Sequence, residues 1–310
     1  MNKSIESRYA GSLLGLAVGD ALGAPVEFMK PGTFKPISDM QGGGHFRLPA
    51  GYWTDDTSMA LCLAESLIAC QKFNADDQMQ RYLRWISTGY HSSQKKAFGI
   101  GQTILKALTS YYRTGDVKKC GQTHAQSAGN GSLMRLAPIP LFYFNDIEKA
   151  VFFSGESSRT THASQVCIDA CRLFGGFIWQ ALHGASKDEI FVFAHAYVNE
   201  DKNIHPDIAS IANGSFLHKN PPKIVATGYV ACSLEAALWA FAKADNFKDG
   251  ALVAVNLGND ADTVGAIYGQ LAGAYWGIEN IPPEWLKILY NANSIKELAL
   301  HLYSLSKTSI

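Results

Sequence analysis

The chain has 310 residues, of which 47% are hydrophobic and 17% charged, and its formal net charge at pH 7 is +0. This apolar content can fill a large core, which excludes an intrinsically disordered chain. The 27 basic residues are scattered and form no stripe, so neither nucleic acid nor an anionic membrane surface is indicated as a partner.

The first apolar run, residues 10–19, follows Lys3 and Arg8 and resembles a short secretory signal. Glu6 lies inside the region that should be basic, and Asp20 follows the run directly, which argues against that interpretation. No run reaches the ~18 apolar residues that would span a membrane. We therefore expect a soluble, cytoplasmic protein.

The same segment predicts a helix that packs closely against another helix. Small residues recur at every fourth position along one helical face, at Gly11, Gly15, Gly19 and Gly23. Pro25 ends this helix and leaves Glu27 on a loop. Asp20 and Glu27 are acids near the end of an apolar segment, where a solvated face is not expected.

An acidic cluster, Thr54-Asp55-Asp56-Thr57, opens the next helix, predicted over Ser58 to Ala69. Acids in a first helical turn are favoured by helix capping and by the helix dipole, which is the simplest interpretation. Carboxylate and hydroxyl oxygens are also the ligands of a hard cation such as Mg²⁺.

The segment Ser127 to Arg135 contains the turn Gly129-Asn130-Gly131. Glycines let backbone N–H groups approach an anion, and a helix start after the turn would add a positive dipole end, so this loop suits a diphosphate. It lacks the lysine of a P-loop, and therefore does not support hydrolysis of a nucleoside triphosphate. His162 and Tyr229 each have an ordinary interpretation as core residues.

Helical spacing dominates the rest of the chain, and turn-rich stretches at 31–51, 127–132 and 199–222 are predicted to be loops. We predict one compact all-α domain over residues 1–310, in the form of an orthogonal helical bundle. The further predicted helices are Ile100 to Leu108, Gln165 to Leu182, Lys187 to Tyr197, Tyr229 to Ala242, Asp262 to Trp276 and Ser294 to Leu305. Expected helix starts include Asn145, Ser186 and Asn259.

A second acidic cluster, Asp260-Ala261-Asp262-Thr263, lies about two hundred residues after the first and also opens a helix. Capping needs one side-chain oxygen, whereas each cluster supplies two carboxylates and a hydroxyl. Four converging carboxylates could hold two cations ~3.5–4 Å apart, as in two-metal hydrolytic sites. Without cations such a group would repel itself.

The six cysteines form no CxxC pair and no Cys/His set with zinc spacing. Several lie in apolar helical stretches, where a buried free thiol is the ordinary state. This pattern agrees with a reducing cytoplasm.

Together, four motifs resemble the ADP-ribosylglycohydrolase family, whose bacterial members include the dinitrogenase reductase-activating glycohydrolase. The resemblance runs from Tyr9 to about Trp276. In chain order the motifs are Gly19-Asp20-Ala21-x-Gly23-x-x-x-Glu27, Thr54-Asp55-Asp56-Thr57, Asn130-Gly131-Ser132-Leu133-Met134-Arg135 and Asn259-Asp260-Ala261-Asp262-Thr263.

The resemblance implies an all-α fold with a cleft that holds two Mg²⁺ or Mn²⁺ ions. It implies that the metal ligands are Thr54, Asp55, Asp56, Asp260, Asp262 and Thr263, and that the catalytic residues are Glu27, Asp55 and Asp262. The implied substrate-binding residues are Asp20, Gly101, Gly129, Asn130, Gly131, Ser132, Met134, His162 and Tyr229. In this scheme His162 lies beside the distal ribose and Tyr229 lies near the adenosine.

The implied reaction releases ADP-ribose from a modified protein side chain or from an ADP-ribose derivative, with arginine-linked ADP-ribose as the first candidate. The expected mechanism places metal ions on the ribose hydroxyls and a water, stabilises an oxocarbenium-like centre and uses Glu27 or a metal-site aspartate to move the proton. We expect a monomer.

Gly99 departs from the family, because many bacterial members have an aspartate there that could pair with an arginine guanidinium. Ser-linked ADP-ribose, O-acetyl-ADP-ribose and a modified nucleobase therefore stay open as substrates. Two alternatives of other classes are a metal-dependent phosphohydrolase and a non-catalytic ADP-ribose binder.

Overall fold

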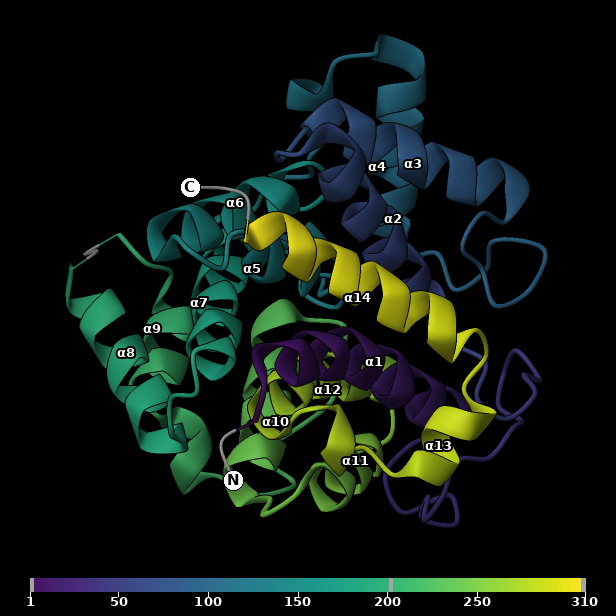
Figure 1. Cartoon of the computed structure of the whole chain (residues 1–310), viewed down its shortest axis with the longest axis vertical. Helices are drawn as coiled ribbons and strands as arrows, with labels where there is room; N and C mark the ends of the chain where they lie inside the picture. Colours follow the sequence, from purple (N-terminus) through teal and green to yellow (C-terminus); the bar gives the residue numbers. More distant parts are fainter. Residues whose placement is uncertain (1–2, 201–202, 308–310) are drawn as a thin grey trace.

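The computed structural model describes residues 3–200 and 203–307, and within these ranges the chain is helical and contains no strand (Figure 1). The first helices are α1 (Ile5–Gly23), α2 (Asp55–Cys70), α3 (Ala75–Thr88), α4 (Gln102–Thr114), α5 (Pro138–Phe142), α6 (Ile147–Arg159) and α7 (Gln165–Leu182). They are followed by α8 (Lys187–Glu200), α9 (Pro206–Ala212), α10 (Val230–Lys243), α11 (Phe247–Val255), α12 (Ala261–Trp276), α13 (Pro283–Ile288) and α14 (Ala292–Ser306). This confirms the predicted all-α class.

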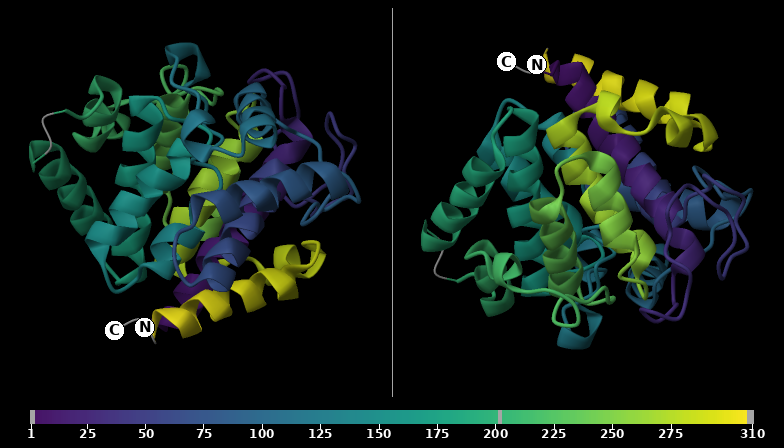
Figure 2. Two further views of the ribbon diagram at one scale, coloured as in Figure 1. Left: turned by 90° about the horizontal axis from the view of Figure 1, so that it is seen from above. Right: turned by 90° about the horizontal axis from the view of Figure 1, so that it is seen from below.

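Two helices from opposite ends of the chain, α1 and α12, pack side by side at the centre of the molecule (Figures 1 and 2). Their backbones approach so closely that a Cβ atom on Gly15 would lie 2.3 Å from the carbonyl oxygen of Gly269. A Cβ atom on Gly19 would lie 1.9 Å from the oxygen of Gly265. The predicted glycine face is therefore a helix contact that tolerates no side chain.

The expectation that no apolar run is long enough to span a membrane needs correction for α1. The segment Ile5–Val26, 22 residues with a mean hydropathy of 1.2, is long and apolar enough to cross a membrane by length and composition. Its most apolar 18-residue stretch is wholly buried inside the protein, where α1 packs on α12, α14 and α2. Because other helices surround α1, its residues are apolar on every face of the helix.

Most of the predicted helices are found with end shifts of at most three residues, but the predicted Ile100 to Leu108 begins at Gln102 and continues to Thr114, and α3 was not predicted. Gln165–Leu182 is confirmed at both ends, and α14 begins two residues before the predicted Ser294. The predicted cap Asn145 is off by one, because Asp146 caps α6 and accepts a hydrogen bond from the N–H of Lys149.

The prediction of a loop over 199–222 is wrong in part, because it contains α9 and the 3₁₀-helix η4 (Ser215–His218). The helix start at His205 and Pro206 was missed: the imidazole of His205 accepts from the N–H of Asp207, and proline occupies the first helical position. Residues 201–202 of this stretch lie outside the described residues.

A buried glutamine ties the loop after α4 to the central helix pair. On α12, Gln270 accepts from the N–H of Ala137 at 2.7 Å and donates to the carbonyl of Met134 at 2.8 Å. Because both ends of this amide are satisfied, it fixes the segment before α5 against α12. This segment includes the last residues of the predicted diphosphate loop.

Candidate active site

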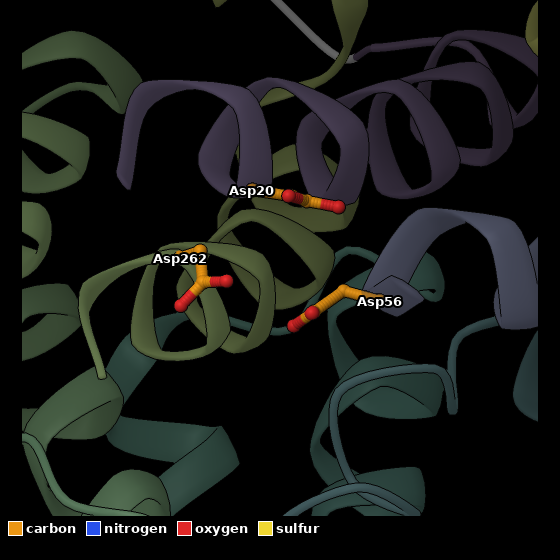
Figure 3. A group of neighbouring side chains, drawn as sticks. All are labelled: Asp20, Asp56 and Asp262. Carbon is orange, nitrogen blue, oxygen red and sulfur yellow. The ribbon is translucent and has the colours of Figure 1, made fainter. Parts of the chain in front are cut away.

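Three carboxylates from three helices meet at one point. Asp20 lies near the end of α1, Asp56 lies in the first turn of α2, and Asp262 lies in the first turn of α12 (Figure 3). Each offers an oxygen, and these oxygens all lie within 4.8 Å of one another. The two acidic clusters therefore converge as predicted, and they are joined by Asp20, which was assigned to the substrate rather than to a metal.

Asp20 is held by the start of α2. Its carboxylate accepts hydrogen bonds from the N–H and hydroxyl groups of Thr54 and Thr57, at 2.6 to 3.1 Å. The hydroxyl of Thr54 also lies 3.0 Å from Asp56 Oδ2. The N-terminal N–H groups of α2 thus stabilise a carboxylate supplied by α1, which locks the two helices together.

The other carboxylates are not fully hydrogen-bonded, although Asp260 accepts a hydrogen bond from Asn130 at 2.6 Å. Glu27, Asp56 and Asp262 each have a buried oxygen without a hydrogen-bond partner among the described residues. Burial raises the pKa of Asp20 to about 6, and burial together with the charges of Asp55, Asp260 and Asp20 raises that of Glu27 to about 9. Burial and neighbouring carboxylates also raise the pKa values of Asp55, Asp56 and Asp262 well above the ordinary range.

This donor set fits divalent cations. Buried carboxylates that repel one another and leave oxygens unpaired require either protons or a positive ion. Oxygen-only ligands favour a hard cation such as Mg²⁺ or Mn²⁺.

Five of these carboxylates line a cavity of about 370 Å³, whereas Asp20 and the predicted ligand Thr54 do not line it. Twelve of the predicted site residues also line it, namely Glu27, Asp55, Asp56, Gly101, Gly129, Asn130, Gly131, Met134, His162, Asp260, Asp262 and Thr263. Lining residues that sequence reasoning did not assign include Phe28, Gln102, Thr103 and Gly228. No motif distinguished these four, because the fold alone brings them to the cavity.

The glycine-rich turn is joined to the acidic group through one side chain. Asn130 Nδ2 donates to Asp260 Oδ2 at 2.6 Å and to the hydroxyl of Ser233 at 2.8 Å. The expected helix start directly after the turn is absent, since residues 131–135 form turns and α5 begins only at Pro138. Any anion binding here must therefore come from the backbone of the turn and from neighbouring side chains.

The imidazole of His162 is buried beside this turn. Its Nδ1 lies 2.8 Å from the hydroxyl of Thr161, which accepts a hydrogen bond from Arg135 at 2.7 Å. Because arginine can only donate, the Thr161 hydrogen is free for Nδ1, and we assign the ring hydrogen to Nε2 on the cavity side. Burial, aided by the charge of Arg135, lowers the pKa of His162 to about 3 and keeps the ring neutral.

Ser132 and Tyr229 do not line the cavity. The hydroxyl of Ser132 is buried and accepts from Ser158 at 2.8 Å. Tyr229 forms an isolated backbone bridge with Gly129 and donates from its hydroxyl to Asp207 at 2.5 Å. Contacts of these two residues with a substrate stay predictions.

Gly99 lies directly against the metal-site group. It has a φ of +78°, and a Cβ atom here would lie 2.3 Å from Asp55 Oδ1. Glycine therefore leaves room for the Asp55 carboxylate, and any side chain would require both a backbone change and a shift of that carboxylate.

An all-helical scaffold whose buried carboxylates converge on a cavity can hold hard cations beside a bound substrate, an arrangement found in hydrolytic enzymes. The chain belongs to the ADP-ribosylglycohydrolase family, which it matches over residues 1–309. Members of this family are hydrolytic enzymes.

The chain is similar to three curated relatives and one solved structure. It is 39% identical to the ADP-ribosylarginine hydrolase Tri1 of Pseudomonas putida over 96% of this chain and 78% of the relative, and 38% identical to that of Serratia proteamaculans over 94% and 78%. It is 31% identical to the ADP-ribosyl-[dinitrogen reductase] glycohydrolase of Rhodospirillum rubrum over 92% and 91%. The structure, titled ADP-ribosylglycohydrolase-related protein complex, matches with a TM-score of 0.87 and 43% identity over 98% of this chain and 100% of that chain.

Proposed function

We propose that this protein removes ADP-ribose from modified arginine side chains and that it requires two divalent cations, Mg²⁺ or Mn²⁺. The observation that carries the proposal is the group of buried carboxylates whose oxygens lack partners inside the described protein. The similarity to ADP-ribosylarginine hydrolases at 39% and 38% identity supports arginine as the acceptor.

Asp20, Thr54, Asp55, Asp56, Asp260, Asp262 and Thr263 would hold the cations. When bound, divalent cations supply charge that orients ribose hydroxyls and lowers the pKa of a water. The turn around Asn130 would bind the diphosphate through backbone N–H groups, and His162 would donate its Nε2 hydrogen to an acceptor oxygen of the substrate.

Glu27 has the properties needed for proton transfer. It lies on the loop after α1, it lines the cavity, and its Oε2 has no partner among the described residues. Cleavage of the C1–N bond develops positive charge on the ribose, which the surrounding carboxylates stabilise. Glu27 would take the proton from the attacking water and deliver a proton to the departing guanidine nitrogen, as a general base and acid.

Hydrolysis of O-linked ADP-ribose is the second candidate, because Gly99 supplies no carboxylate for a guanidinium. A phosphohydrolase using the same acids would release orthophosphate instead of ADP-ribose.

Peptides carrying Arg-, Ser- or Cys-linked ADP-ribose, together with O-acetyl-ADP-ribose, test the proposal. Each is incubated with Mg²⁺, with Mn²⁺ or with EDTA, and released ADP-ribose and orthophosphate are measured by chromatography. We expect release of ADP-ribose from the Arg-linked peptide, loss of this release with EDTA, and no turnover by Asp55→Ala or Asp262→Ala. Full activity of either variant, or full activity in EDTA, would overturn the metal-dependent mechanism.

We also propose that the protein acts as a monomer in a reducing cytoplasm. The six cysteines are free and four of them are buried, which supports a compartment without disulfide formation.

A further inference from the structure

Phe28 is an exposed aromatic residue at the edge of the catalytic cavity. It follows Glu27 directly, lines the cavity and exposes 63% of its surface. Its backbone has a φ of +64°, which is unfavourable for a bulky residue. A large apolar side chain kept both exposed and in this conformation indicates a functional constraint.

The backbone around Phe28 is fixed to the second acidic cluster. The N–H of Phe28 donates to the carbonyl of Asn259 at 2.5 Å, and the N–H of Asn259 donates to the carbonyl of Met29 at 2.7 Å. Asn259 also has a positive φ, of +51°, and directly precedes Asp260. The backbone that carries the Phe28 side chain is therefore held in a defined place relative to the carboxylates.

Three further aromatic rings form a continuous set of contacts with the ring of Phe28. The ring centroid of Phe28 lies 5.3 Å from His45 and 6.4 Å from Phe46, and Phe46 lies 5.1 Å from Phe98. All three contacts are edge-to-face. These four residues are named here the aromatic rim. Phe98 directly precedes Gly99, so both ends of the rim adjoin residues that line the cavity.

No basic side chain competes for the faces of the rim. Among the described residues, no lysine or arginine lines the cavity beside it. Aromatic faces attract a planar cation, because the ring quadrupole favours positive charge.

We propose that the aromatic rim binds the guanidinium of the ADP-ribosylated arginine, with Phe28 as the residue that determines specificity for this leaving group. The inference rests on the proposed function. A guanidinium is planar and weakly hydrated, so it stacks on a ring without the carboxylate partner that Gly99 cannot supply. The adenine of ADP-ribose is the competing occupant, since a base can also stack on a ring.

Phe28→Leu removes the ring and keeps an apolar side chain, whereas Phe28→Tyr keeps the ring. Phe152→Leu is the matched control, because Phe152 is 50% exposed and lies on α6, away from the residues that line the cavity. The substrate is free ADP-ribosyl-L-arginine, which contains no neighbouring peptide residues. We measure kcat/KM for its hydrolysis and, by calorimetry in the presence of Mg²⁺, the Kd for ADP-ribose.

We expect Phe28→Leu to lower kcat/KM about fivefold, the size of a cation–π contact near 1 kcal/mol. Phe152→Leu should stay near the wild-type value, Phe28→Tyr should retain more activity than Phe28→Leu because it keeps the ring, and the Kd for ADP-ribose should be the same in all four proteins. Wild-type kcat/KM in Phe28→Leu would overturn the inference, and so would a weakened Kd for ADP-ribose, which would assign the ring to the adenine. If the wild-type protein itself releases no ADP-ribose from the arginine substrate, the proposed function fails instead.

Discussion

Replacing Glu27 by glutamine should change how the stability of the cation-free protein depends on pH. The pKa of Glu27 is raised from 4.5 to about 9, first by burial and then by Asp55, Asp260 and Asp20. Between these two pKa values the folded protein holds a proton that the unfolded chain has released. The free energy of unfolding therefore decreases as the pH rises through this interval.

The magnitude follows from the proton difference. One extra proton bound by the folded state changes the free energy of unfolding by about 1.4 kcal/mol per pH unit. Over the three units from pH 5 to pH 8, Glu27 accounts for a loss of roughly 4 kcal/mol. Glu65, whose pKa is lowered to about 2, is ionised in both states throughout this window and contributes nothing to the slope.

The measurement is urea unfolding of the wild-type protein and of Glu27→Gln, in EDTA, at pH 5, 6, 7 and 8. The wild-type protein should lose about 4 kcal/mol more than the variant over this interval. Excess Mg²⁺ should flatten the wild-type slope, because a bound cation favours the ionised carboxylates. Parallel profiles for the two proteins in EDTA would refute the reasoning, since Glu27 would then not hold an extra proton in the fold.

Three further predictions concern helix packing, Mg²⁺ binding and one buried thiol. Gly15→Ala should lower the free energy of unfolding by about 3 kcal/mol in urea titrations, because the new Cβ atom meets a backbone carbonyl of α12. The control Gly101→Ala, whose Cβ atom would meet nothing within 4 Å, should lower it by less than about 1 kcal/mol. Gly99→Ala should weaken Mg²⁺ binding at least about tenfold by calorimetry, because it displaces Asp55, and an unchanged Kd would contradict this. Cys171 is buried and its thiol pKa is raised to about 11, so mass spectrometry should find it unalkylated by iodoacetamide until the protein unfolds.

Most of the long helices and the two acidic clusters could be predicted from the sequence because both depend on local information, although the 14-residue helix α3 was not predicted. Apolar spacing over Gln165–Leu182 defines the buried face of α7 without knowledge of its neighbours. The acids next to threonines at the starts of α2 and α12 can be recognised in the sequence itself, without knowledge of the fold. Short helices such as α9 were missed because a seven-residue segment contains too little periodicity to distinguish it from a loop.

The place of Asp20 and the presence of Phe28 depend on tertiary contacts. Asp20 joins Asp56 and Asp262 only because the first turn of α2 meets the end of α1, which no spacing in the sequence encodes. Phe28 reaches the cavity edge through backbone hydrogen bonds to Asn259, more than two hundred residues away.

The glycine face of α1 connects the stability of the fold to the geometry of the site. Gly23 packs so closely on the start of α12 that a Cβ atom would lie 2.4 Å from the backbone N of Asp262. Asp20 precedes this contact by less than one helical turn, so the distance between the two carboxylates is set by how near the two backbones can come. A side chain at Gly19 or Gly23 would push the helices apart and separate Asp20 from Asp262, since neither backbone can yield. The small residues that bring the two helices together are therefore also what brings their carboxylates within reach of one cation.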